Sequence, residues 1–235
     1  MIKIYMLIFI LILFGSYSNL NAEEYMNISF IDVGEGDSIL IESSGQNALI
    51  DAGNLLSGYD VQQYLHKRSI DRLDALILTH PHLDHIGGAF QIAQIFKPLL
   101  FADNAQDLRD KSGKKTEVNR WYSELRASMP AYRALSIGDT LRIGDVKLSV
   151  LWPSTTARVE DWNTNSLVMR LEYGKFTALL MGDGNKDTEI GLLKNQADLR
   201  ANIIKVGHHA ASDCCTAEFI SSVKAEVFVI SVNNE

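Results

Sequence analysis

Residues 79–85 of this chain read Thr79-His80-Pro81-His82-Leu83-Asp84-His85. They follow an apolar run, residues 75–79, which we predict to be a buried strand that ends at the histidines. Four side chains that can bind a metal therefore fall within six positions of a loop, where they can point into one volume. Imidazole and carboxylate ligands suit zinc, and also manganese or iron. The alternative is a histidine-rich surface loop without metal, which would gather half of the six histidines by accident.

Two later strand ends carry further candidate ligands. Residues 176–181 are apolar and lead into Gly182-Asp183-Gly184, and residues 203–206 lead into Gly207-His208-His209. Taken alone, such residues are more often a turn carboxylate or a surface histidine. Beside the first run, we interpret them as a second and a third contribution to the same metal site.

The remaining pattern predicts a layered α/β protein. Short apolar segments separated by turn residues predict strands at 28–33, 38–42, 47–51, 146–151, 166–173 and 227–232. Helical spacing of apolar residues follows Asp60, follows the Gly87-Gly88 pair, and recurs over 118–125 and 190–197. We find no Pro/Gly-rich linker, so the strands and helices are expected to form one domain.

The order of the motifs resembles the metallo-β-lactamase superfamily, with His80-x-His82-x-Asp84-His85, then Gly182-Asp183, then Gly207-His208. A narrower resemblance is to the extracellular metallo-hydrolase domain of ComEC-type DNA-uptake proteins. It covers essentially the whole chain after the first 22 residues. The segments that carry it are Phe30-Ile-Asp-Val-Gly-Glu-Gly-Asp-Ser38, Leu49-Ile-Asp-Ala-Gly53, residues 78–88, Asn165-Ser-Leu-Val168 and Lys205-Val-Gly-His-His209.

This resemblance implies a four-layer αββα sandwich with one or two divalent ions at one edge of its two sheets. By motif position it implies that His80 and His82 bind one ion, that Asp84 and His208 bind the other, and that Asp183 bridges them. His85 matches a further ligand position of the second ion. Asp51, Asn165 and His209 are expected to support the ligands from behind.

Two carboxylates are candidates for catalysis. If Asp84 is not fully used as a ligand, it could accept the proton of the attacking water. Asp37, in the turn of residues 34–38, either accepts backbone donors or acts near the metal, and the resemblance leads us to place it near the site. Two ions a few ångströms apart would generate hydroxide near neutral pH and neutralise charge on the substrate oxygens.

The chain departs from the superfamily pattern in two places. Many members carry a ligand histidine shortly before the bridging aspartate, but residues 160–181 contain none, and Asn163 and Asn165 stand there instead. Amide oxygens favour hard ions, so manganese is the alternative to zinc. The sequence also ends at Asn233-Asn234-Glu235, where ComEC-like domains continue with a closing helix. The sandwich is therefore expected to lack its C-terminal end, through natural trimming or because the sequence is a fragment.

The N-terminus predicts export. Lys3 precedes an apolar run at residues 4–14, which is shorter than the roughly 20 residues that span a bilayer. We interpret residues 1–22 as a signal peptide and residues 23–235 as a secreted or periplasmic domain with no stable membrane span after cleavage. An uncleaved anchor helix is the alternative. The adjacent Cys214 and Cys215 do not provide a disulfide framework.

The predicted function is that of an exported metal-dependent hydrolase, a phosphodiesterase or a nuclease. The net charge of −7 argues against a protein that coats nucleic acid through bulk electrostatics, but it permits a local basic groove. Basic residues over 111–126 beside Trp121 could line such a groove, although a solvated amphipathic helix is the favoured interpretation. Two alternatives remain open: hydrolysis of a small ester, lactam or phosphocholine-type substrate, and a metal-binding envelope protein without turnover. The pattern does not predict an oligomeric state.

Overall fold

Two six-stranded mixed sheets form the centre of the protein. The computed structural model describes residues 25–106, 116–154 and 161–233, so the predicted signal peptide and Lys111, Lys114 and Lys115 lie outside the described residues. The first sheet has the order β1 to β6, with strands Met26–Phe30, Ile39–Ser43, Gln46–Ile50, Ala75–Leu78, Leu100–Asp103 and Tyr132–Ala134. The second has the order β12-β11-β10-β9-β8-β7, where β7 to β12 are Thr140–Ile143, Val146–Trp152, Val168–Tyr173, Phe176–Leu180, Ile203–Lys205 and Val227–Val229.

Burial follows from the sequence of each strand. β4 is apolar throughout and pairs in parallel with β3 and β5, and all four of its residues are buried. β8 alternates instead: Val146, Leu148 and Val150 join the core between the sheets, and the residues between them are half-buried. After a register shift, Trp152 packs on the other face of the sheet with Leu179 and Leu192. A continuous apolar run thus marks a central strand covered on both faces, and alternation marks a strand with one core face.

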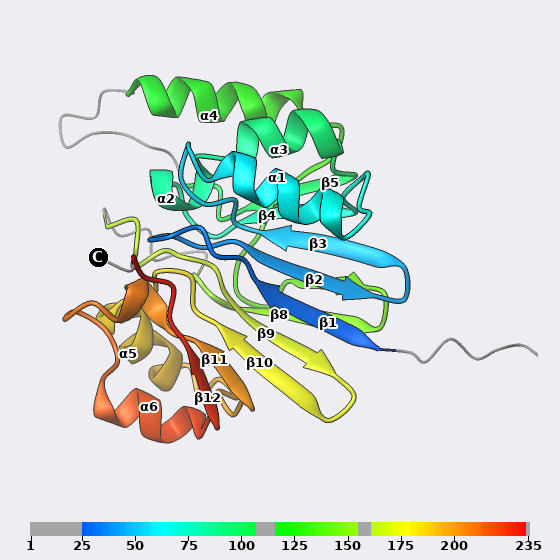
Figure 1. The fold of residues 1–235 in the computed structure, drawn as a ribbon. Coiled ribbons are helices and arrows are strands. Elements are labelled where there is room, and N and C mark those ends of the chain that lie inside the picture. Colours follow the sequence, from blue (N-terminus) through cyan, green and yellow to red (C-terminus); the bar gives the residue numbers. More distant parts are fainter. Residues whose placement is uncertain (1–24, 107–115, 155–160, 234–235) are drawn as a thin grey trace, which may run out of the picture.

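The helices form the two outer layers. α1 (Gly58–Lys67), α3 (Ala89–Phe96) and α4 (Glu117–Ser128) cover the outer face of the first sheet, and α5 (Lys186–Lys194) and α6 (Ala217–Val223) cover the second, as Figure 1 shows. Three apolar clusters fill the spaces between these four layers. The predicted αββα sandwich is therefore confirmed. Within the described ranges, no helix has the length and apolar character needed to cross a membrane.

α4 is held to the first sheet by a buried carboxylate. Asp103, fully buried at the end of β5, accepts hydrogen bonds from the hydroxyls of Tyr122 (2.6 Å) and Tyr132 (2.8 Å) and from Arg126 Nη2 (2.6 Å). The Tyr122 side chain is itself buried, and the guanidinium of Arg126 lies 4.9 Å from the centre of its ring. Arg126 thus serves to anchor this helix.

The loop after β1 must pass very close to the metal-ligand run. Gly36 has a φ of +118°, and a Cβ built there would lie 2.2 Å from the backbone oxygen of Asp84. We expect Gly36→Ala to destabilise the fold by clearly more than the about 1–2 kcal/mol that a left-handed alanine costs. Gly174→Ala is the matched control, because Gly174 also has a positive φ (+57°) but nothing lies within 4 Å of its added Cβ. Urea unfolding of both variants measures the difference, and equal losses would contradict the close contact.

Candidate metal centre

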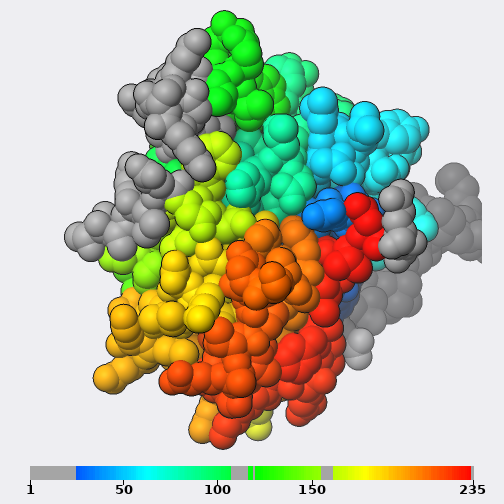
Figure 2. Space-filling view, turned by 90° about the vertical axis from the view of Figure 1, so that its left-hand side faces the viewer, coloured from blue at the N-terminus to red at the C-terminus, as the bar shows by residue number. Residues whose placement is uncertain are grey.

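Candidate ligands from the segments that follow three strands meet at one edge of the sandwich. β4 ends at Leu78 and leads to His80, His82 and the short helix α2 (Leu83–Ile86), while β10 leads to Gly182-Asp183. β11 leads to the 3-10 turn η1 (Gly207–Ala210). Figure 2 faces this edge, where the blue-green segment that includes α2 borders the orange segment that follows β11. Strands from both sheets thus deliver polar side chains to one place.

A first cluster consists of His80, His82 and Asp183, which each offer one ligand atom within 4.8 Å of the others. His80 Nε2 lies 2.9 Å from His82 Nδ1 and 3.6 Å from Asp183 Oδ2. His80 is buried, and its other ring nitrogen, Nδ1, lies 3.1 Å from Thr79 Oγ1. Because that hydroxyl already donates to Asp51, it accepts from His80 Nδ1 and leaves the lone pair of Nε2 directed into the cluster.

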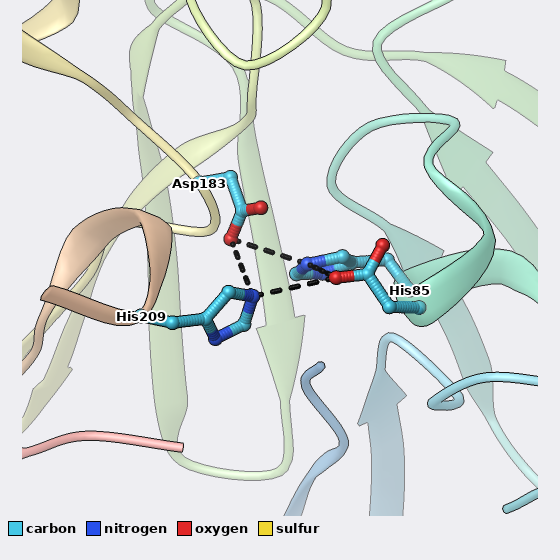
Figure 3. A group of neighbouring side chains, drawn as sticks. His85, Asp183 and His209 are labelled. Atoms are coloured by element: carbon cyan, nitrogen blue, oxygen red, sulfur yellow. Dashed lines mark ion pairs between the residues drawn. The ribbon is translucent and has the colours of Figure 1, made fainter. Parts of the chain in front are cut away.

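A second cluster consists of Asp84, His85, Asp183 and His209. Asp183 Oδ1 lies 3.1 Å from His85 Nε2 and 3.3 Å from His209 Nε2, and Figure 3 shows these three side chains pointing toward one another. Asp84 Oδ2 completes the group at 3.4 Å from His209 Nε2 and 3.6 Å from His85 Nε2. Asp183 is thus shared by both clusters.

The ring nitrogens that face away from the second cluster are already occupied. His85 Nδ1 donates to Asp51 Oδ2 at 2.8 Å, and His209 Nδ1 donates to the backbone oxygen of Ser231 at 3.0 Å. These bonds fix the tautomer of each neutral ring, so both Nε2 atoms present lone pairs to the centre once the rings have lost a proton. Asp51 is fully buried and also accepts from the backbone N–H of Thr79 at 2.7 Å. It therefore holds His85 and the start of the histidine run through three hydrogen bonds.

A divalent ion fits this arrangement. The buried atoms His85 Nε2, His209 Nε2 and Asp183 Oδ1 have no hydrogen-bond partner among the described residues. Their separations of 3.1 and 3.3 Å resemble the roughly 3.3 Å between two ligands on a tetrahedral zinc ion. Unsatisfied buried polar atoms are costly, so a group that accepts their lone pairs would stabilise the site. The described residues therefore form a candidate site for one or two divalent ions.

Electrostatics at the centre favour positive charge. Burial alone would lower the pKa of His85, but the carboxylates of Asp183 and Asp51 raise it well above its usual value. Burial also opposes protonation of His209, yet its contacts with Asp183 and Asp84 raise its pKa to about 9. The same contacts hold the pKa of both Asp84 and Asp183 well below the usual range despite their burial. Two ionised carboxylates thus attract protons onto the histidines when no metal competes.

Asp37 is also in this region, behind His85. It is buried and belongs to a group with Asp51 and His85 whose ligand atoms lie within 4.8 Å of one another. Its carboxylate forms an ion pair with the buried Lys205 and accepts a hydrogen bond from Ser231 Oγ at 2.9 Å. The structure thus places Asp37 near the centre, as expected, but engaged by a lysine that the sequence analysis had not assigned to the site.

The structure places the two neighbouring histidines in other positions than the sequence analysis expected. His209, expected as a support, joins the second cluster, whereas His208, expected as a ligand, bonds through Nδ1 to Asp213 Oδ1 (2.7 Å) and through Nε2 to Asn163 Nδ2 (3.1 Å). Both residues have positive φ values, 40° and 52°, so the chain turns sharply at this point. Asn165, the third expected support, donates Nδ2 to the backbone oxygen of Asp161 at 3.1 Å and braces the loop that carries Asn163.

Comparison with known proteins identifies the family. The model of the metallo-beta-lactamase superfamily matches residues 31–183. The chain belongs to this superfamily. The metallo-β-lactamase fold is shared by a solved structure, the class B3 di-zinc metallo-β-lactamase LRA-12 from an Alaskan soil metagenome, with a TM-score of 0.53 and 15% identity over 76% of this chain and 74% of that one.

Two relatives of this superfamily member are similar to it in sequence. ComE operon protein 3 of Bacillus subtilis is 28% identical over 229 residues, which cover 87% of this chain but only 28% of that protein. Exodeoxyribonuclease WalJ of Streptococcus pneumoniae is 29% identical over 115 residues, which cover 48% of this chain and 39% of the relative. The expected resemblance to ComEC-type proteins is confirmed.

Metal binding by this superfamily member is expected to weaken as the pH falls. His85 and His209 have raised pKa values, about 9 for His209, so both carry protons at pH 7 in the metal-free protein and must lose them to bind an ion. We expect the apparent affinity to fall by about tenfold per pH unit for each proton released. Competition with a chromophoric chelator at pH 8, 7 and 6 measures this, and calorimetry in two buffers counts the protons. An affinity that does not change with pH would contradict the expectation.

Proposed function

We propose that this chain is an exported phosphodiesterase that hydrolyses DNA or RNA at a centre of two divalent ions, zinc first and manganese as the alternative. The observation that carries the proposal is the sharing of Asp183 between two clusters of ligands. Paired ions a few ångströms apart are a recurrent solution for in-line displacement at phosphorus, as in nucleases and phosphatases. The name of the relative WalJ, an exodeoxyribonuclease, supports the same substrate class.

The side chains have distinct roles in this mechanism. Bound ions would supply a hydroxide nucleophile near neutral pH and offset negative charge on the phosphate oxygens. Asp84 is the carboxylate of the centre that solvent reaches, with its side chain 33% exposed, and its low pKa keeps it ionised at neutral pH. It can therefore orient an attacking water by accepting a hydrogen bond from it. His80 and Asp183, both buried, hold fixed positions beside it.

Location outside the cytoplasm is part of the proposal. It is supported by the signal-peptide pattern of residues 1–22 in the sequence. The acidic net charge is compatible with a nuclease that contacts only the few phosphates near its centre. Fractionation of cells that express the full chain, with sequencing of the N-terminus of the product, tests cleavage after Ala22.

Substrate class is tested by parallel assays on one preparation. The chain, loaded with zinc or with manganese, is incubated with bis(p-nitrophenyl) phosphate, with supercoiled plasmid, with single-stranded RNA and with a chromogenic cephalosporin. We expect hydrolysis of the phosphodiester and of a nucleic acid, loss of both with a chelator, and loss of both in His82→Ala. The exposed His66→Ala is the control for histidine substitution. Cleavage of the cephalosporin alone, or full activity in His82→Ala, would overturn the proposal.

A further inference from the structure

Asn163 occupies the place where the superfamily pattern has a ligand histidine. It lies in the loop before β9, next to Trp162, whose ring centre is 5.1 Å from that of His82. Asn163 is more than nine-tenths buried and directly follows Trp162 in the chain. The contact of Trp162 with His82 and the hydrogen bond of Asn163 to His208 place the amide at the edge of the metal centre.

The two polar atoms of this amide differ in their hydrogen-bond partners. Nδ2 donates a hydrogen bond to His208 Nε2 at 3.1 Å. Oδ1 is buried and has no hydrogen-bond partner among the described residues. A buried carbonyl oxygen without a partner is costly and rare, so an unfilled acceptor beside a group of metal ligands indicates where a cation is bound.

His208 explains why the amide has this orientation. Its Nδ1 lies 2.7 Å from Asp213 Oδ1, and because a carboxylate only accepts, Nδ1 carries the proton. The lone pair then lies on Nε2, where it accepts from Asn163 Nδ2. With both ring nitrogens engaged, His208 has no lone pair left for a metal. The reverse amide orientation would point Oδ1 at the lone pair of Nε2, and repulsion disfavours it.

We propose that Asn163 Oδ1 is a ligand of the ion held by His80 and His82, and that His208 with Asp213 is a positioning pair that aims this oxygen at the ion. The inference rests on the metal centre of the proposed function, but it does not depend on the substrate. It also assigns a metal preference to the first cluster. An amide oxygen is a harder ligand than imidazole, so the first cluster accepts manganese more readily than a site with histidine at position 163 would.

The test measures ion binding rather than turnover. Equilibrium dialysis with Zn²⁺ and with Mn²⁺, together with electron paramagnetic resonance of bound Mn²⁺, gives the number of ions and the affinity of each. His82→Ala and His209→Ala first identify which affinity belongs to which cluster. We expect Asn163→Ala to lower, by about 10–100-fold, the affinity for the ion whose binding His82→Ala also weakens. The affinity for the other ion is expected to stay within about threefold of the wild-type value. Asn163→His is expected to restore Zn²⁺ affinity and to lower the affinity for Mn²⁺ relative to Zn²⁺.

Two substitutions of His208 separate positioning from ligation. In His208→Gln, Oε1 can accept from the amide of Asn163, so affinity at the first cluster is expected to stay within about threefold. In His208→Ala the acceptor is lost, and a decrease of about 10-fold or more is expected. Equal losses in the two variants, or a loss confined to the second ion, would show that His208 is itself a ligand and would overturn the inference. Unchanged binding in Asn163→Ala would overturn it as well.

The outcomes also separate this inference from the proposed function. Wild-type protein that binds two ions with the expected pattern of variants but cleaves no phosphodiester would uphold the Asn163 assignment and reject the nuclease. Wild-type protein that binds no ion would reject both. Thermal unfolding of each variant shows whether a loss of binding reflects the site or the fold, and Asn163→His provides a second variant if Asn163→Ala does not fold.

Discussion

Asp183→Ala is expected to lower the rate of metal-dependent hydrolysis at least about 1,000-fold, which corresponds to about 4 kcal/mol of transition-state stabilisation. Asp183 is the residue whose two carboxylate oxygens face different clusters. Oδ2 lies 3.6 Å from His80 Nε2, and Oδ1 lies 3.1 Å from His85 Nε2. Without this carboxylate, two ions would repel each other across the gap with no shared anion between them. We therefore expect weaker binding of the ions as well as slower turnover.

The measurement compares kcat/KM with bound metal in the same samples, at saturating zinc or manganese. Asp183→Asn keeps the shape of the side chain but removes its charge, and a loss close to that of Asp183→Ala would assign the effect to charge. Asp71→Asn is the control, because Asp71 is exposed and precedes β4, whereas the centre follows the other end of that strand. Activity within tenfold of wild type in an Asp183→Ala protein that still binds two ions would contradict the bridging role.

Lys205→Ala is expected to destabilise the protein by about 3–5 kcal/mol, because it leaves the carboxylate of Asp37 buried without its partner. Lys205 is fully buried, and its ammonium group pairs with Asp37 and donates to the backbone oxygen of Gly182 at 3.4 Å. For a chain of this size the loss corresponds to a fall in Tm of about 10 °C. Activity should fall too, since Gly182 precedes Asp183 and its backbone would shift.

A double variant separates the contribution of the ion pair to stability from that of the packing around it. Lys205→Met with Asp37→Leu removes both charges, and we expect it to recover most of the stability that Lys205→Ala loses. Lys147→Met is the matched surface control, because its pair with Glu172 at 3.1 Å is 43% and 34% exposed and such pairs contribute at most about 1 kcal/mol. Differential scanning calorimetry of the four proteins provides the comparison. A double variant as unstable as Lys205→Ala would show that packing dominates.

Long apolar runs and the histidine motif predicted most of the sandwich. The short strands β5, β6 and β7 were not predicted, because runs of three or four residues are too short for a pattern to stand out, even in β7, where buried Leu141 and Ile143 alternate with exposed residues. They belong to the sheets because they pair with β4, β5 and β8, respectively, which is a tertiary effect. Asp103 illustrates this, since its three side-chain donors, Tyr122, Arg126 and Tyr132, lie far along the chain.

The site was predicted in location but not in every assignment. Sequence order alone cannot tell which of His208 and His209 faces the clusters, because two consecutive left-handed residues break the alternation expected at a strand end. Lys205 carried a usable signal: a lysine inside the apolar run at 203–206 must bury its charge and therefore needs an acidic partner. The partner, Asp37, is 168 residues away in the sequence, and only the fold brings the two together.

The segment that follows β12 has a consequence for how the protein matures. Ser231 supports His209 through its backbone oxygen and bonds to Asp37 through its hydroxyl, and the backbone N–H of Glu35 donates to Asn233 Oδ1 at 2.8 Å. Two of these contacts, Ser231 with Asp37 and Glu35 with Asn233, join residues almost 200 positions apart, and such distant contacts form late because loop closure must precede them. During synthesis the histidine run would leave the ribosome long before the last strand. We therefore expect tight ion capture to coincide with the final folding step, so that an incomplete chain stays metal-poor and inactive.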